Sequence, residues 1–304
     1  MNIHVEHIKT YKKDGRMPIN EVYKSYSKLK DSLWIDEVVC SQKIGIKGQR
    51  YLPIMAFRTR KKGDALWIIS GIHGEEPAGV NAIAKNIRFI NKLAKKIPIV
   101  LLPLCNPSGY RRDWRYPYFK RRPRNMSAPS VGDSEHYLLN KKEKARAKKP
   151  MLREAEELTA FIVHFSKKYK PLVVLDLHED ESAKKLYIYS QGKLKNYDPI
   201  ARKVVGILKK RGFRFYDRGK TSSGDKIIKG VVSNIEDGSI DELLSAEKII
   251  ANGQVRRGPD AKSVIVIETK TVDIPLKKRV KAHSYILKSS KGIYALAKDI
   301  FDEA

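Results

Sequence analysis

Two histidines, each followed by a glutamate three residues later, are the first feature of this sequence that could do chemistry: His73 with Glu76, and His178 with Glu181. A hydrolytic zinc site uses about three protein ligands from His, Glu, Asp or Cys and keeps one position open for water. His73 and Glu76 can supply two ligands from one turn, and His178 can supply the third. Glu268 is then available as a general base toward the metal-activated water and as a general acid toward a leaving amine.

The positions of these residues strengthen a hypothesis that a lone His-x-x-Glu spacing supports only weakly. Buried strands are predicted by four apolar runs, at 65–72, 97–107, 171–180 and 263–269. These runs end at or beside His73, Asn106, His178 and Glu268. Helical apolar periodicity follows or separates them at 77–90, 151–169, 198–211 and 278–302. In sheets of this kind, ligands collect at the C-terminal ends of the strands.

This alternation predicts an α/β fold: a single domain with a mixed, largely parallel β-sheet flanked by helices on both faces. Strands from the whole chain converge on one site, so we expect one catalytic domain over residues 38–304. Residues 1–37 are polar and mixed, and we expect them to pack on this core or to precede it.

Composition excludes several classes of protein. Two cysteines in 304 residues exclude a disulfide scaffold and favour a reducing compartment. No apolar stretch approaches the ~20 residues of a membrane helix, and the first residues lack the apolar region of a secretory signal. We therefore expect a cytoplasmic protein with no membrane partner. The 62 Lys and Arg against 34 Asp and Glu give a net charge of +28, which favours anionic partners.

Six short motifs occur in a fixed order between about residues 38 and 280. They are Gly71-Ile72-His73-Gly74-Glu75-Glu76, Asn106-Pro107-Ser108-Gly109-Tyr110, Trp114-Arg115, Leu177-His178 followed by LYIYSQG, Asp237-Gly238-Ser239-Ile240-Asp241, and Ile267-Glu268-Thr269. No single motif is specific, but the set in this order resembles the zinc carboxypeptidases, the carboxypeptidase A-like metallopeptidases. That family includes the related succinylglutamate desuccinylase/aspartoacylase branch, which releases acyl groups from amino acids.

The resemblance implies a role for each matching residue. His73, Glu76 and His178 become the ligands of one Zn²⁺ per chain, and Glu268 becomes the general base and acid. Arg115 matches the arginine that polarises the scissile carbonyl and stabilises the oxyanion, a kind of role worth ~3–4 kcal/mol where such donors have been removed. The implied activity is cleavage of an amide bond.

Two departures from the family pattern concern substrate recognition. The Asn-Arg pair that grips a terminal carboxylate has no Arg in the matching stretch, 132–136, and Ser233 stands near the position of the substrate-facing Tyr. Substrate binding is therefore assigned to Asn106 and to nearby arginines whose guanidinium groups suit a carboxylate. These arginines are Arg111, Arg112, Arg121, Arg122 and Arg124.

The substrate is expected to be a small anionic peptide or an acyl-amino-acid. Residues 111–125 carry seven Lys or Arg and one Asp, and residues 141–149 carry six and one Glu. The first run begins beside Arg115 and is expected to rim the active cleft, whereas the second is interpreted as a solvated face. Two alternatives remain: an N-acyl amino acid deacylase, and a basic binding protein without catalysis. Nucleic acid is a less favoured ligand, because no nucleic-acid fold signature is present.

Overall fold

The computed structural model describes residues 9–44, 50–118, 129–194, 197–233 and 235–302. In chain order, the elements are α1 (Ile19–Tyr26), β1 (Trp34–Ile44), β2 (Arg50–Thr59), β3 (Gly63–Ser70), α2 (Pro77–Lys85), α3 (Ile87–Ala94), β4 (Ile99–Leu102), α4 (Pro107–Tyr110), α5 (Arg153–Phe165), β5 (Tyr169–Asp180), β6 (Tyr187–Gly192), α6 (Pro199–Lys209), β7 (Arg218–Lys220), β8 (Lys226–Ile228), β9 (Val231–Ser233), α7 (Ile240–Ser245), β10 (Lys248–Ala251), β11 (Gln254–Arg257), β12 (Ser263–Lys270) and α8 (Leu276–Asp302).

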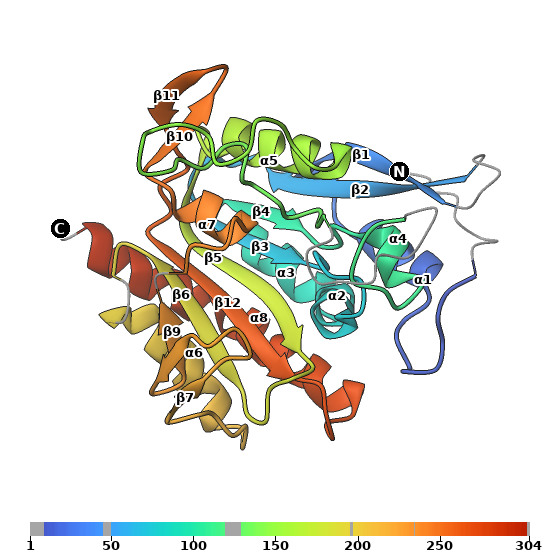
Figure 1. The fold of residues 1–304 in the computed structure, drawn as a ribbon. Helices are drawn as coiled ribbons and strands as arrows, with labels where there is room; N and C mark the ends of the chain where they lie inside the picture. The colour runs from blue at the N-terminus through green and yellow to red at the C-terminus, as the bar shows by residue number, and fades with distance from the viewer. Residues whose placement is uncertain (1–8, 45–49, 119–128, 195–196, 234, 303–304) are drawn as a thin grey trace.

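Ten strands form one mixed sheet in the order β1-β2-β4-β3-β5-β12-β6-β9-β8-β7. Its centre, β4-β3-β5-β12, is parallel and consists of the four strands that the apolar runs predict. Strands β1 and β2 continue it antiparallel on one side, and β6 pairs antiparallel with β12 on the other. The predicted fold class is confirmed: one α/β domain built on a mixed, centrally parallel sheet (Figure 1).

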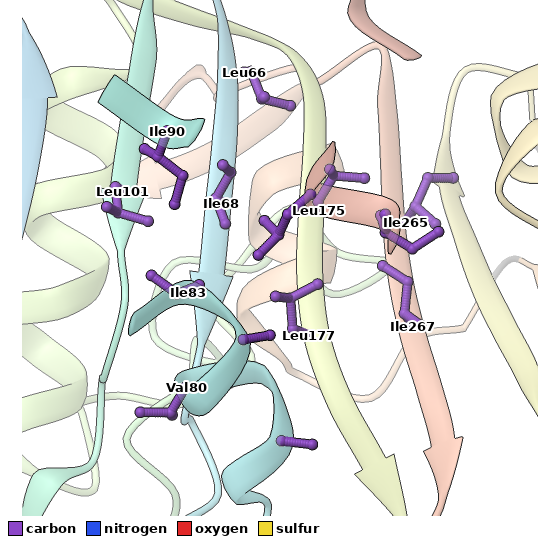
Figure 2. Close-up of a cluster of buried hydrophobic side chains, with 14 of the residues drawn as sticks. Leu66, Ile68, Val80, Ile83, Ile90, Leu101, Leu175, Leu177, Ile265 and Ile267 are labelled. Carbon is purple, nitrogen blue, oxygen red and sulfur yellow. The ribbon is translucent and has the colours of Figure 1, made fainter. Parts of the chain in front are cut away.

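Alternation along the central strands divides the core into two layers. Leu175 and Leu177 of β5 and Ile265 and Ile267 of β12 pack toward the helices α2, α3 and α8 (Figure 2). Val174 belongs to the cluster on the opposite face of the sheet, where α5 and α7 lie. Because successive side chains of a strand point to opposite faces, Asp176 and His178 point to the α5 and α7 side. The polar side chains of the site therefore lie on one face, and the apolar ones beside them lie on the other.

The helices cover both faces of the sheet (Figure 1). Helices α1, α2, α3, α6 and α8 bury their apolar residues in one cluster, and α5 and α7 bury theirs in the other. Ile19 and Val22 of α1 are fully buried in the first cluster, so part of the N-terminal segment packs on this core. Within the described residues, no helix combines the length and the apolar character needed to cross a bilayer.

The structure differs from the prediction in two places. The helix predicted over 77–90 is broken into α2 and α3 at Asn86, whose side chain donates a hydrogen bond to the Ala82 carbonyl at 2.7 Å. The strand predicted over 97–107 is shortened to β4, because Pro103 lacks the donor needed to continue a ladder. Asn106 then caps the short helix α4.

Candidate metal centre

The turn between β3 and α2 places His73 and Glu76 at the C-terminal edge of the sheet. Gly71 leaves β3 with a φ of +68°, a conformation that favours glycine. Gly74 lies so close to the turn at 109–110 that a Cβ there would overlap the backbone of Gly109 and Tyr110. Only glycine fits at position 74. Backbone conformation at Gly71 and close packing at Gly74 therefore explain why glycines stand on either side of His73.

Glu76 joins the two histidines that the sequence predicts as zinc ligands. Its Oε1 lies 2.7 Å from Nδ1 of His73, and its Oε2 lies 2.9 Å from Nδ1 of His178. Each of the three residues offers one potential ligand atom, and these three atoms all lie within 4.8 Å of one another. The two imidazole rings meet edge-on, with their centroids 5.0 Å apart. Two histidine nitrogens and one carboxylate are a donor set that hydrolytic zinc sites use, so the residues fit the ion.

Two buried acids lie behind His178. Asp176 Oδ2 is 3.2 Å from Nε2 of His178, on the side of the ring away from Glu76. Asp241 of α7 is also buried, and burial together with the nearby Asp176 raises its pKa well above the ordinary value. In its protonated form Asp241 can donate a hydrogen bond to Asp176. A carboxylate behind a metal-binding histidine fixes the ring and its tautomer.

The electrostatics of the cluster favour a charged His178 beside an ionised Glu76. Burial opposes the charge on His178, but Asp176 and Glu76 outweigh it and hold its pKa well above the ordinary value. Burial likewise opposes ionisation of Glu76, and the two histidines outweigh it and lower its pKa. A metal cation bound between these residues would take over the role of the proton on His178, which supplies the positive charge beside Glu76.

Glu268 lies beside the cluster on the next strand. It is in register with His178 across the parallel pair β12 and β5, so both side chains point to the same face of the sheet. Burial, together with the carboxylates of Glu76 and Asp180, raises its pKa to about 8, although His178 and Arg115 act in the opposite direction. A carboxyl group with a pKa near neutrality can both accept and return a proton.

Arg115 reaches the same cluster from the loop after α4. Its NH1 donates to Oε1 of Glu75 at 3.0 Å and to Oε1 of Glu76 at 3.3 Å. About a third of the side chain, 35%, stays exposed. The guanidinium therefore lies next to a predicted metal ligand and retains a solvent-facing side.

Asn106 has a structural role, which corrects its assignment to substrate binding. It is fully buried. Its Oδ1 accepts from the Gly109 amide at 3.1 Å and from Gln42 at 3.2 Å, and its Nδ2 donates to the Arg115 carbonyl at 3.0 Å. The amide is thus used to shape the loop that carries Arg115.

The acidic run after His178 separates into two faces. Glu179 points to the opposite side from His178, where it accepts a hydrogen bond from the Ala78 amide and pairs with the buried Arg279 of α8. Asp180 points to the site side and accepts from the Tyr187 hydroxyl at 2.7 Å. Arg279 is therefore buried against Glu179 and does not contribute to a cationic rim around the site.

The predicted substrate-binding arginines are only partly described. Arg111 and Arg112 follow α4, and the Arg112 guanidinium lies 5.3 Å from the ring centroids of both Trp114 and Tyr118. Arg112 thus contacts two aromatic rings of this segment. Arg121, Arg122 and Arg124 lie outside the described residues.

Sequence reasoning missed Arg16. Its buried guanidinium donates to the Gly74 carbonyl at 2.9 Å, to the Tyr110 carbonyl, and to Asp113 at 2.6 Å. It therefore ties the N-terminal segment to the turn next to His73 and to the loop before Arg115. The guanidinium also pairs with Asp14, two residues away. No local pattern reveals its role in the site, because Gly74, Tyr110 and Asp113 lie 58 to 97 positions away.

We expect Arg16→Met to destabilise the protein by about 3 kcal/mol, because it leaves buried carbonyls and an acidic pair without their donor. Urea denaturation measures the loss. Arg16→Lys is the conservative control and should recover part of it, since one ammonium cannot serve all of these acceptors. Wild-type stability in Arg16→Met would mean that the contacts with Gly74 and Tyr110 contribute nothing to the fold.

Asp176→Asn is expected to lower zinc affinity by about 10- to 100-fold, the usual cost of removing the group that orients a metal-binding histidine. Competition with a fluorescent chelator measures the affinity. Asp180→Asn is the matched control, since Asp180 lies on the same strand and face without contacting His178. Equal losses in both variants would contradict a specific role for Asp176.

Comparison with known proteins agrees with this geometry. Residues 62–196 match a family model described as the succinylglutamate desuccinylase/aspartoacylase catalytic domain. No functionally curated protein matches the chain. Among solved structures, a candidate metallopeptidase from Shewanella baltica OS155 has a TM-score of 0.69 at 18% identity, with 92% of each chain covered. Bovine thrombin-activatable fibrinolysis inhibitor has a TM-score of 0.63 at 12% identity, covering 94% of this chain and 98% of that one.

A carboxypeptidase A from Helicoverpa armigera has a TM-score of 0.54 at 14% identity, covering 92% of this chain and 71% of the other. At such identities these matches establish the fold, which is that of the metallocarboxypeptidases. The resemblance seen in the motifs is therefore confirmed: the chain is similar to the zinc carboxypeptidase family, and residues 62–196 match its desuccinylase/aspartoacylase branch. Fold and family match together indicate a hydrolase of the metallopeptidase or deacylase kind.

Proposed function

We propose that this protein is a zinc-dependent hydrolase that cleaves an amide bond in a small anionic substrate, either a peptide or an acyl-amino-acid. The observation that carries the proposal is the convergence of His73, Glu76 and His178, with Glu268 in register beside them. Both cysteines are free and buried, which supports a cytoplasmic setting for this activity.

Each residue of the site has a distinct role in this proposal. His73, Glu76 and His178 would hold the zinc ion, which when bound would supply Lewis acidity toward the substrate carbonyl and lower the pKa of water. Glu268 accepts the proton of the attacking water and passes it to the leaving amine. Arg115 donates to the carbonyl oxygen as that oxygen gains negative charge. Asp176 keeps Nδ1 of His178 directed at Glu76.

The family match favours an acyl-amino-acid as the substrate. It covers β3, β5 and both predicted histidine ligands, and its description names desuccinylase and aspartoacylase activities. The segment 132–136 has no arginine to bind the terminal carboxylate of a peptide, which also disfavours a peptide substrate. We propose that Arg111 and Arg112 bind the anionic group of the substrate. The same role is proposed for Arg121, Arg122 and Arg124.

A substrate panel tests the proposal on the zinc-loaded protein. N-succinyl and N-acetyl derivatives of Asp and Glu form one arm, and peptides with free or amidated C-termini form the other. We expect release of the amino acid in the first arm. Hydrolysis confined to peptides with a free C-terminus would favour the carboxypeptidase alternative. If neither arm shows zinc-dependent hydrolysis, the result would favour the remaining alternative, a basic binding protein without catalysis.

A further inference from the structure

The basic residues of the helices are concentrated on one side of the sheet. Helix α8 has seven Lys or Arg against two Asp, and α6 has three with no acid. Helices α2 and α3 together add three basic residues and no acid, and α1 adds one of each sign. On the other side, α5 has one Arg and three Glu, and α7 has two acids and no basic residue. The charge that the helices carry is thus unevenly divided between the two sides of the sheet.

We propose that the outer surface of α1, α2, α3, α6 and α8, here called the basic face, binds the phosphate backbone of double-stranded nucleic acid. This function is separate from hydrolysis. The residues of the site point to the α5 and α7 side of the sheet, whereas the basic face covers the opposite side.

The helices that carry the basic face pack against one another. Helix α8 contacts α2, α3 and α6, and α1 contacts α2. The ammonium group of Lys203 on α6 lies 3.9 Å from the position a Cβ on Gly292 of α8 would occupy. Lys203 therefore lies next to the turn of α8 that carries Lys288 and Lys291, all three of which are exposed.

A groove on the same face adds to this surface. It has a volume of about 590 Å³ and lies between α1 and the α2 and α3 pair. Four exposed cations line it, Lys24, Lys28, Lys85 and Arg88, against the single acid Glu21.

Few of these cations are neutralised within the protein. Over the described part of the chain, Arg279 and Lys298 are the basic residues of these five helices that pair with a carboxylate. The others repel one another, and self-repulsion of this kind destabilises a compact state. An external polyanion removes that cost and releases its own counterions on binding.

The chemistry of the face favours a duplex backbone over other polyanions. Anionic membranes attract basic surfaces as well, but stable adsorption of a helix also uses apolar side chains that insert between lipids. Among the described residues, the exposed large hydrophobic side chains lie outside these five helices. Single strands are held by stacking on aromatic rings. Tyr285 is instead covered by Arg211 at 4.8 Å, and the Tyr294 hydroxyl donates to the Asp64 carbonyl. Cations alone suffice to bind duplex phosphates.

The test measures fluorescence anisotropy of a labelled, mixed-sequence DNA duplex of about 20 base pairs against salt concentration. We expect the wild type to bind at about 50 mM salt and to weaken steeply as salt rises. Lys203→Glu/Lys288→Glu/Lys291→Glu should bind at least about tenfold more weakly and flatten the slope of log K against log salt by about 2 to 3.

The matched control is Lys141→Glu/Lys142→Glu/Lys144→Glu. These exposed lysines lie in the loop before α5, where Arg146 is bonded to Glu242 of α7. Both triple variants change the net charge equally, so only location differs between them. The control should bind duplex within about twofold of the wild type. Thermal melting and zinc content verify that both variants are folded.

Three results would overturn the proposal. The first is absence of duplex binding by the wild type at low salt. The second is an equal loss in both triple variants, which would make the charge a bulk property. The third is wild-type binding to phosphatidylserine vesicles but not to the duplex, which would assign the face to a membrane surface.

Discussion

His178→Ala is expected to remove both bound zinc and hydrolysis, the largest effect we anticipate for a single substitution. The wild type should hold about one zinc per chain after dialysis, and the variant almost none. Besides deleting a ligand, the change leaves Asp176 buried without its partner, and it removes one of the two histidines that favour the ionised form of Glu76. Atomic absorption of the dialysed protein measures the metal, and turnover of the best substrate measures activity.

His164→Ala is the control for this experiment. His164 lies on the exposed side of α5, away from the metal cluster, so zinc and turnover should match the wild type. Glu181→Ala tests the competing His-x-x-Glu spacing and should also retain zinc. If His178→Ala keeps full zinc occupancy while Glu181→Ala loses it, the ligand set assigned from the sequence is wrong.

The central sheet and the site at its edge could be predicted because the signals are local. The runs that form β3, β4, β5 and β12 are buried on both faces, and such strands are recognisable as apolar stretches between helices. The alternation Leu175-Asp176-Leu177-His178 already separates a polar face from an apolar one. This alternation places Asp176 on the same face as His178, and the structure brings the two side chains to 3.2 Å from each other.

What could not be predicted depends on contacts between distant residues. Asn106 has the type of side chain that binds substrates, but Gln42 and the Arg115 carbonyl engage it. Glu179 is adjacent to a predicted ligand and yet pairs across 100 positions with Arg279. In each case the spacing in the chain leaves open which partner a polar group meets, and the packing of loops and helices decides it.

The cationic residues likewise fall into two groups: those that the sequence makes obvious and those that only the packing of helices brings together. The runs at 111–125 and 141–149 are conspicuous in the sequence, and the first suggested a cationic rim around the cleft. The cations of α6 and α8 are spread along helical repeats, so no dense run marks them. Packing of α6 against α8 brings them together on one surface. A surface of this kind is visible only after the helices are placed.

Glu268→Gln is expected to retain zinc and substrate binding and to lose most of kcat, by about 10²- to 10⁴-fold. Glutamine keeps the size of the side chain and removes its ability to accept a proton, so only the chemical step should suffer. Burial and the neighbouring carboxylates raise the pKa of Glu268 to about 8 against the opposing effect of His178, so the group is suited to exchange a proton near neutral pH. Rapid-quench turnover, zinc content and KM together separate chemistry from binding.

Asp180→Asn provides the comparison for Glu268→Gln, because Asp180 is the next carboxylate on the same face and is held by Tyr187. If Asp180→Asn abolished turnover while Glu268→Gln remained active, the base would have to be reassigned to Asp180. A parallel fall in zinc content and kcat in Glu268→Gln would instead make Glu268 a support for the metal site. Full zinc, an unchanged KM and a collapsed kcat are the combination that only a proton-transferring residue produces, since a ligand loses metal and a binding residue raises KM.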